Sequence, residues 1–299
     1  MRFLTVGSIA IDSIETENET RQKIMGGSAP FSAAASVHFV ETFMTGVIGD
    51  DYPDEWLERF SKRGVNLTAV ERRKGKSFHW HGKYDKSFSC RTSIKTELGV
   101  FENYQPSLPE NLRSVDFVFL GNIKPQIQET IIDSLQSSCF IAMDTMNCWI
   151  TQSRESVLRL MKKVNCVFLN DEELELIVGT CVPTTGLEKL RKLGIATAVV
   201  KLGKWGSVLL YDNEFFWSPA YPVDNVIDPT GAGDSFAGAF MGCLASYGFS
   251  TSRDFKRAML YASSVSSFTV ENFEPFALLD LKKEKIVERF QFLRKLINY

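Results

Sequence analysis

Several features that mark common protein classes are missing from this sequence. Neither charge is in excess, because 34 Lys+Arg stand against 36 Asp+Glu. Binding to nucleic-acid phosphates needs a cationic excess on some face, so nucleic acid is not expected as a main partner. No apolar run approaches the roughly 20 residues of a membrane-spanning helix. Residues 1–11 also lack the long apolar centre and the cleavage site of a signal peptide. These absences predict a cytoplasmic protein without a membrane partner.

Metal and disulfide signals are missing as well. The six cysteines include no C-x-x-C pair, which argues against a zinc site or a disulfide framework. We expect them to be reduced and structural. His79 and His81 would share one face of a strand, but no Cys or carboxylate ligand stands near them in the sequence, so exposed polar positions are expected. The cysteines are Cys90, Cys139, Cys148, Cys166, Cys181 and Cys243.

Apolar residues are plentiful, at 44% of 299 residues, and they fall into alternating strand-like and helical runs. Such alternation predicts an α/β fold with a mostly parallel central sheet covered by helices on both faces. No Gly/Ser- or Pro-rich linker divides the chain, so residues 1–299 are predicted to form a single domain. The strand-like runs are residues 3–8, 43–46, 117–121, 140–144, 166–170 and 198–202. The helical runs are residues 31–40, 54–63, 126–136, 155–163 and 187–193, and nearly everything from Gly233 onward, including 280–296.

Residues 76–100 break this pattern. They alternate with period two, which places Phe78, Trp80, Gly82 and Tyr84 on one face, and a turn is expected at residues 85–87. The pattern predicts a hairpin with an aromatic face, to which residues 6–12 and 21–25 could add edge strands. The pattern alone leaves open whether this is a packed flap or a lid over a pocket.

The strongest chemical signal is DPTGAGDSF at residues 228–236, between the strand-like residues 222–227 and a helical run. Backbone N–H groups of Gly231, Ala232 and Gly233 can converge there with the positive end of a helix on an anion, so we expect a phosphate site. The spacing fits neither the dinucleotide-binding fingerprint nor a Walker motif with its lysine.

Asp234 beside this turn needs a separate explanation, because a carboxylate repels an anion. Phosphoryl transfer supplies one, since a carboxylate can orient an alcohol and accept its proton. The alternative is that Asp234 only caps the helix.

The string 228–236 resembles the C-terminal signature of the ribokinase-like (PfkB) carbohydrate and nucleoside kinases, and the resemblance extends along most of the chain. The resemblance implies a ribokinase-like fold with a small β-strand lid formed around residues 76–100. The other matching motifs are Asp12 after the first strand, the pair Gly26-Gly27, Asn170-x-x-Glu173 and the loop Lys201-Leu-Gly203-Lys-Trp-Gly206.

For the nucleotide, the resemblance implies ATP and Mg²⁺ as cofactors. It makes Asp234 the base for the acceptor hydroxyl and the three residues 231–233 the anion hole, with residues 263–272 walling the adenine. Lys201 could reach a phosphate, although an exposed lysine at a strand end is nearly as plausible. The resemblance further implies that Asp228 and Thr230 shape the glycine turn. It implies that Asn170 and Glu173 organise Mg²⁺ and the phosphates, Glu173 through water. Gly203 and Gly206 would belong to the nucleotide-binding loop.

For the acceptor, the resemblance implies that Asp12, Gly26 and Gly27 contact hydroxyls beneath the lid. Arg91 could clamp a carboxylate or phosphate on the acceptor, or could be a solvated arginine. Asn122, like Asp144 and Asn147, follows an apolar strand at the edge where α/β sheets bind ligands, although turn chemistry also explains such residues.

The sequence departs from the family where an asparagine often hydrogen-bonds the sugar. Phe31 stands there, and this leaves the acceptor's identity open.

The resulting hypothesis is an ATP-dependent kinase that transfers the γ-phosphoryl group to a hydroxyl of a small sugar or sugar acid. A nucleoside kinase is the alternative within the class, with Phe31 and the aromatic flap stacking a base. A non-catalytic sugar or nucleotide sensor is the alternative outside it. A homodimer through the lid and a requirement for a monovalent cation both stay open.

Overall fold

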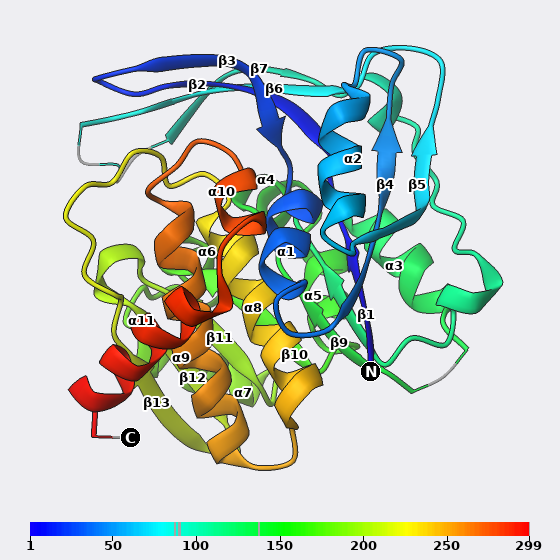
Figure 1. Ribbon diagram of the computed structural model, residues 1–299. Coiled ribbons are helices and arrows are strands. Elements are labelled where there is room, and N and C mark those ends of the chain that lie inside the picture. Colours follow the sequence, from blue (N-terminus) through cyan, green and yellow to red (C-terminus); the bar gives the residue numbers. More distant parts are fainter. Residues whose placement is uncertain (87, 89–90, 137, 299) are drawn as a thin grey trace.

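The computed structural model describes residues 1–86, 88, 91–136 and 138–298 and contains two β-sheets (Figure 1). The larger has nine strands in the order β13-β12-β11-β10-β9-β8-β1-β4-β5, parallel from β11 to β5 and antiparallel at β12 and β13. Its strands are β1 (Arg2–Val6), β4 (Glu41–Ile48), β5 (Asn66–Arg72), β8 (Phe117–Leu120), β9 (Phe140–Met143), β10 (Cys166–Asn170), β11 (Ala198–Lys201), β12 (Ser207–Tyr211) and β13 (Glu214–Ser218).

Helices cover both faces of this sheet, which confirms the predicted fold class. One face packs against α1, α8 and α9 and the other against α3, α5, α6 and α7, each through its own apolar core. Central strands such as β8 and β10 are buried on both faces, as their nearly continuous apolar sequences predicted. The helices are α1 (Ser28–Ser36), α2 (Asp54–Lys62), α3 (Pro125–Ser134), α4 (Asn147–Gln152), α5 (Arg154–Met161), α6 (Asp171–Val178), α7 (Pro183–Lys192), α8 (Ala232–Tyr247), α9 (Ser252–Thr269), α10 (Phe276–Leu279) and α11 (Lys283–Leu296).

One predicted strand is wrong. Residues 222–227 form an irregular connection that follows β12 and β13 in the chain. The backbone N–H of Ile227 donates to the Val270 carbonyl rather than to a ladder partner. Pro222 also lacks the N–H that a strand interior requires.

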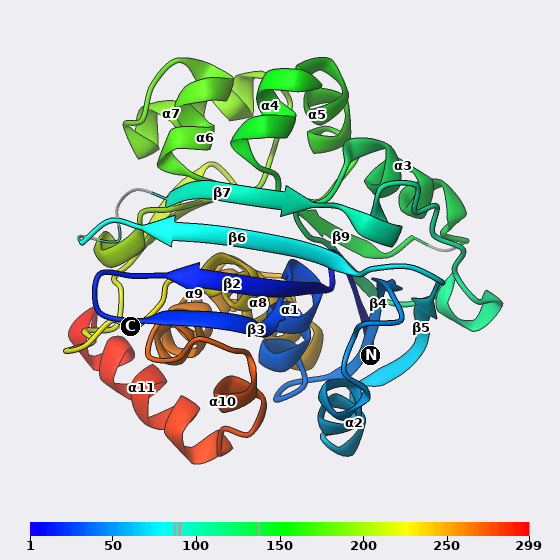
Figure 2. The ribbon, with the colours of Figure 1, turned by 90° about the horizontal axis from the view of Figure 1, so that it is seen from above.

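The smaller sheet contains β2 (Ala10–Glu15), β3 (Thr20–Gly26), β6 (Phe78–Tyr84) and β7 (Arg91–Glu97) in the order β3-β2-β6-β7. Figure 2 shows these strands running side by side across the top of the molecule. In Figure 1 the arrowheads of β4 and β5 point toward this sheet, so the carboxyl ends of the parallel strands face it. The smaller sheet is therefore the lid.

Two details of the lid differ from expectation. Residues 2–6 belong to β1 of the central sheet, and β2 begins only at Ala10, where it pairs with both β3 and β6. It is an interior strand of the lid, not an edge strand. Ser87 of the predicted turn and Cys90 lie outside the described residues, and the other five cysteines are free thiols.

No described helix has both the length and the hydropathy to span a bilayer.

Candidate active site

The turn at residues 228–233 joins the connection after β13 to the N-terminus of α8, at the carboxyl edge of the sheet. Gly231 is the N-cap residue and has φ of 76°, in the left-handed region that favours glycine. A Cβ at position 231 would lie 2.2 Å from the Phe31 ring, which packs directly beneath the turn. Phe31 is only 1% exposed. Its ring supports the turn and is not open to stack on a base.

Asp228 fixes the shape of this turn. Its carboxylate is fully buried, and Oδ1 accepts hydrogen bonds from the Thr230 N–H at 2.9 Å and from the Thr230 hydroxyl at 2.6 Å. The Ala232 N–H donates to the Pro229 carbonyl at 3.1 Å. The anion hole that the sequence predicts from three residues therefore has its middle N–H already engaged, which leaves Gly231 and Gly233 for it.

Asp234 lies in the first turn of α8 and is half-buried. Burial raises the pKa of its carboxyl group to about 7, and the negative charge of Asp144 acts in the same direction. The positive charges of Lys201 and Arg91 oppose this rise. A carboxylate that titrates near neutral pH suits a group that must take up a proton and release it.

Lys201, the last residue of β11, is part of the same cluster. Its Nζ lies 2.5 Å from Asp144 Oδ2 and would lie 3.0 Å from a Cβ placed on Gly233. Burial lowers the pKa of the Lys201 ammonium, but the charges of Asp144 and Glu173 outweigh burial and raise it overall. The sequence left open whether this lysine is simply exposed, and its side chain is 18% exposed. It faces the turn.

Asn170 and Glu173 form a capping box at the start of α6. The Glu173 N–H donates to Asn170 Oδ1 at 2.7 Å, and the Asn170 N–H donates to Glu173 Oε2 at 2.8 Å. Burial raises the pKa of Glu173 to about 8, and the neighbouring Asp144 charge adds to the effect. The spacing of Asn170 and Glu173 is thus also explained by their capping of α6.

Asp144 and Glu173 fit a divalent cation that keeps most of its water and binds chiefly through nucleotide phosphates. Both are buried beside Lys201, and the pKa of Glu173 is raised first by burial and then by the negative charge of Asp144, which a nearby cation would offset. Among the residues described, no group of three or more His, Cys, Asp or Glu is placed to enclose a metal ion by itself. Protein ligands alone therefore do not build a cation site here.

The predicted nucleotide loop follows β11. Gly203 and Gly206 have φ of 53° and 93°, and the Leu202 N–H donates to the Gly206 carbonyl at 2.8 Å. A Cβ at Gly206 would lie 2.1 Å from the Ser218 carbonyl oxygen, so the loop presses against β13. Residues 263–272 reach the turn at residues 228–233 from α9, because the Val270 carbonyl accepts the N–H groups of both Ile227 and Asp228.

Asp12 lies on the face of β2 that it shares with Trp80 of β6. Its carboxylate is 3% exposed, and Oδ1 has no hydrogen-bond partner among the described residues. Burial raises its pKa to about 8, assisted by the charges of Asp228 and Asp234. A Cβ at Gly26 would lie 1.8 Å from Asp12 Oδ2, which explains the glycine. Gly27, with φ of 100°, is the N-cap residue of α1.

Arg91 and Asn122 meet at Met146, just after β9. Arg91 lies on β7 of the lid and donates to Met146 Sδ at 3.6 Å, and its charge lowers the pKa of both Asp12 and Asp234. Arg91 is exposed, yet its charge opposes the rise in pKa of both carboxyl groups. Asn122 donates to the same sulfur at 3.2 Å and accepts from the Trp149 indole at 2.9 Å, so its amide is engaged within the protein.

Trp80 belongs to the aromatic face predicted for residues 76–100, although the sequence assigned it no role apart from the other residues of that face. A Cβ at Gly82 would lie 2.0 Å from its ring, so the indole lies flat over Gly82 on the inner face of the lid. Its Nε1 donates to Ser93 Oγ at 3.1 Å, and the Arg91 guanidinium lies 5.4 Å from the ring centroid. Period-two alternation identified the face, but only the folded sheet shows that Gly82 leaves room for a flat ring.

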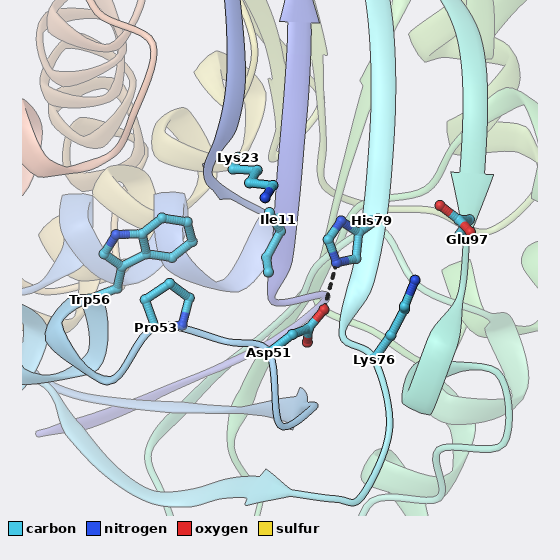
Figure 3. Close-up of a pocket in the computed structure, with 8 residues that line it drawn as sticks. All are labelled: Ile11, Lys23, Asp51, Pro53, Trp56, Lys76, His79 and Glu97. Carbon is cyan, nitrogen blue, oxygen red and sulfur yellow. Dashed lines mark hydrogen bonds and ion pairs between the residues drawn. The ribbon is translucent and has the colours of Figure 1, made fainter.

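The two histidines lie on the opposite, outer face of the lid. His79 Nε2 lies 2.8 Å from Asp51 Oδ2, and His81 Nε2 lies 2.9 Å from Glu15 Oε1. They are half-buried and paired rather than exposed, because the fold supplies carboxylates from distant segments. His79 and Asp51 line a cavity of about 300 Å³ together with Trp56 of α2, and no residue of the 228–233 turn lines it. Figure 3 shows the bond between His79 and Asp51.

Comparison with known proteins gives one consistent result. The model of the pfkB family of carbohydrate kinases matches residues 2–278. The chain is 26% identical to a cytidine kinase from Thermococcus kodakarensis over 246 residues, 80% of this chain and 87% of that protein. It is 30% identical to a ribokinase from Staphylococcus aureus, over 95% of this chain and 94% of that one.

The fold is similar to that of a Burkholderia thailandensis nucleoside kinase solved in complex with inosine. The TM-score is 0.81 at 18% identity, over 99% of this chain and 97% of that one. A structural likeness at this identity carries the fold alone, whereas the family model spans most of the sequence. The chain therefore belongs to the pfkB family of carbohydrate kinases, phosphotransferases that use ATP and act on an alcohol group of a sugar or nucleoside.

Proposed function

We propose that this protein transfers the γ-phosphoryl group of ATP to a hydroxyl of a small sugar or sugar acid, with Asp234 as the general base. The observation that carries the proposal is the position of Asp234, in the first turn of α8 with a pKa of about 7, beside the Gly231 turn and Lys201. The N-cap residue of α8 is Gly231, and Asp234 lies three residues further along the helix, so Asp234 is not its N-cap residue.

In the proposed mechanism, the N–H groups of Gly231 and Gly233 and the positive end of α8 stabilise charge on the transferred phosphoryl group. Lys201, held by Asp144, adds a positive charge on the phosphate side. Asp234 orients the acceptor hydroxyl and accepts its proton as the bond to phosphorus forms. Mg²⁺, when bound, would offset the negative charge of the phosphates. Asp144 and Glu173 are the residues that would hold it, Glu173 through water.

For the acceptor, we propose that Asp12 binds hydroxyl groups beneath the lid, next to Gly26 and Gly27. Arg91 favours a sugar acid, because its positive charge acts on both Asp12 and Asp234 and could pair with an anion on the substrate.

A nucleoside is the second candidate. The Trp80 ring lying flat over Gly82 is a surface on which a planar base could stack, and relatives named cytidine kinase and nucleoside kinase support the idea.

We extend the proposal to a monovalent cation beside Asp228. Its Oδ2 is buried and has no hydrogen-bond partner among the described residues, and burial raises the pKa of this group to about 6. A cation would satisfy this oxygen. Turnover is then expected to rise when K⁺ replaces a bulky organic cation at constant ionic strength, and equal rates would rule the cation out.

We also propose that the chain works as one kinase domain in the cytoplasm. The lid offers a homodimer its outer strand β7, whose residues are all exposed. Light scattering of the purified protein would measure the oligomeric state, and a monomer at all concentrations would exclude the dimer.

The test of the function is phosphoryl transfer from ³²P-labelled ATP to a panel of sugars, sugar acids and nucleosides. Asp234→Asn is expected to lose at least about 10²-fold in turnover while still binding ATP. Asp133→Asn, an equal change at an exposed position of α3, should keep full activity. Turnover of Asp234→Asn within about threefold of the native protein would contradict the assignment of the base.

The same panel separates the acceptor classes. If the substrate is a sugar acid, Arg91→Lys should raise KM for acids and leave neutral sugars almost unchanged, because a bidentate contact is lost. If the substrate is a nucleoside, Trp80→Leu should raise KM for nucleosides most. A nucleoside used in preference to every sugar by the native protein would replace the first candidate with the second.

A further inference from the structure

A chain of hydrogen bonds joins the lid to the catalytic turn. The Thr230 hydroxyl donates to Asp228 Oδ1 at 2.6 Å, and the Tyr84 hydroxyl lies 3.0 Å from the same Thr230 oxygen. Because the single proton of Thr230 is directed at Asp228, Tyr84 is the donor in the second bond. The order is Tyr84 to Thr230 to Asp228, and Asp228 also accepts the Thr230 N–H at 2.9 Å.

The two ends of this chain belong to separate parts of the fold. Tyr84 is the last residue of β6, and Figures 1 and 2 both place that end of the lid above the connection between β13 and α8. Thr230 directly precedes Gly231, whose left-handed conformation starts the phosphate-binding turn. The bond therefore links a strand of the lid to the residue that sets the geometry of the turn.

Tyr84 is held for this contact by its surroundings. It is 7% exposed, packs in a small apolar cluster with Ile14 and Ile24, and its ring lies 6.1 Å from that of Phe88. Burial raises the pKa of its hydroxyl, which therefore stays protonated and able to donate at neutral pH. Leaving the buried Tyr84 hydroxyl without a partner would cost free energy. The bond to Thr230 therefore stabilises the lid and the turn in the positions that the structure shows.

We propose that Tyr84 is a positioning residue for phosphoryl transfer: by donating to Thr230 from the lid, it holds the turn at Gly231 in its phosphate-binding conformation when the lid is closed. The proposal rests on the proposed kinase function and deepens it. It assigns the lid a second task beside covering the substrate, because the anion hole is fully ordered only with the lid in place. Tyr84 itself touches neither phosphate nor base in this role.

The first test is Tyr84→Phe, which keeps the ring and removes the hydroxyl. Loss of one neutral hydrogen bond is expected to lower kcat about threefold to tenfold, with KM for the acceptor nearly unchanged. Tyr104→Phe is the matched control, because its hydroxyl also sits beside a threonine, 3.5 Å from Thr45, but far from the turn. It should leave kcat unaltered. A loss shared by both variants, or a rise in KM alone, would overturn the proposal.

A double-mutant cycle tests whether the effect passes through Thr230. In a Thr230→Val background, Tyr84→Phe should cause no further loss, whereas in Thr230→Ser, which keeps the hydroxyl, it should lower kcat as in the native protein. Equal losses of kcat in the valine and serine backgrounds would show that Tyr84 acts by another route.

Hydrogen exchange gives a readout that does not depend on activity. In the protein without ligand, Tyr84→Phe is expected to speed amide exchange in peptides covering residues 228–236 at least about threefold, and Tyr104→Phe is not. Unchanged exchange would refute the inference even if the kinase is active. Absence of phosphoryl transfer by the native protein would instead refute the proposed function, while the exchange result would still decide the link.

Discussion

Replacing Asp234 with asparagine should make the protein more stable while abolishing its activity. The cause is the raised pKa of this carboxyl group, from 3.8 to about 7. Between those values the folded protein holds a proton that the unfolded chain has released, so the free energy of unfolding falls as pH rises through this window. Above about pH 7 the whole penalty is present, and below about pH 4 it is absent. Asparagine has the same shape and no charge, so it avoids the penalty.

The size of the effect follows from the shift. Three pKa units correspond to about 4 kcal/mol. Because Asp234 is only half-buried, solvent screening reduces this to about 1–2 kcal/mol. For a chain of 299 residues that predicts a Tm about 2–4 °C higher for Asp234→Asn at pH 8.

Scanning calorimetry without nucleotide, from pH 8 down to pH 5, measures this difference. The gap between Asp234→Asn and the native protein should narrow steadily as pH falls, while Asp133→Asn should track the native protein throughout. A variant no more stable than the native protein at pH 8, or a gap that ignores pH, would refute the argument that burial strains this carboxylate.

Three further predictions follow from the site and the lid. The value of kcat/KM should rise with pH through about 7. Lys201→Met should move the midpoint of this rise to higher pH, because the Lys201 ammonium lowers the pKa of Asp234. Steady-state rates from pH 5.5 to 9 measure the midpoint, and an unchanged midpoint would disprove the effect of Lys201 on Asp234. Gly231→Ala should lose at least about 10²-fold in turnover, because its methyl group would overlap the Phe31 ring, whereas Gly64→Ala, with a similar φ of 89° but open space around it, should keep activity. Asp51→Asn should lower the free energy of unfolding by about 1–2 kcal/mol at pH 7 in urea titrations. Burial raises the pKa of Asp51, but hydrogen bonds from His79 and Ser77 outweigh burial and hold the pKa below 3.8. The stability that Asp51 contributes should therefore fade as pH falls below about 4. A loss of stability in Asp51→Asn that does not depend on pH would contradict this account.

The apolar strands and the lid illustrate what could be predicted from sequence. Strands such as β8 and β10 were recognisable because a strand buried on both faces must be apolar throughout. The inner face of β6 followed from period-two alternation. The connection at residues 222–227 was misassigned, because its apolar residues resemble a strand while the Ile227 N–H bonds to the Val270 carbonyl, just after α9.

The directions of the Lys201 ammonium and of the Ala232 N–H could not be predicted from the sequence. An ammonium at a strand end can face solvent or a neighbouring strand, and only the parallel pairing of β9, β10 and β11 brings Asp144 within 2.5 Å of it. The Ala232 N–H belonged to the predicted anion hole, but the turn directs it at the Pro229 carbonyl. Spacing along a chain does not specify such directions.

The order of motifs along the chain indicated the kind of protein, because the glycine turn before a helix predicts a phosphate site and five motifs in order resemble those of the ribokinase-like kinases. The distances between groups were decided by the tertiary structure alone. The proximity of Asp12 and Asp234 and the bond from Tyr84 to Thr230 depend on segments far apart in the sequence. Electrostatic and hydrogen-bond energies depend on the distances between groups in space. A sequence pattern does not contain those distances.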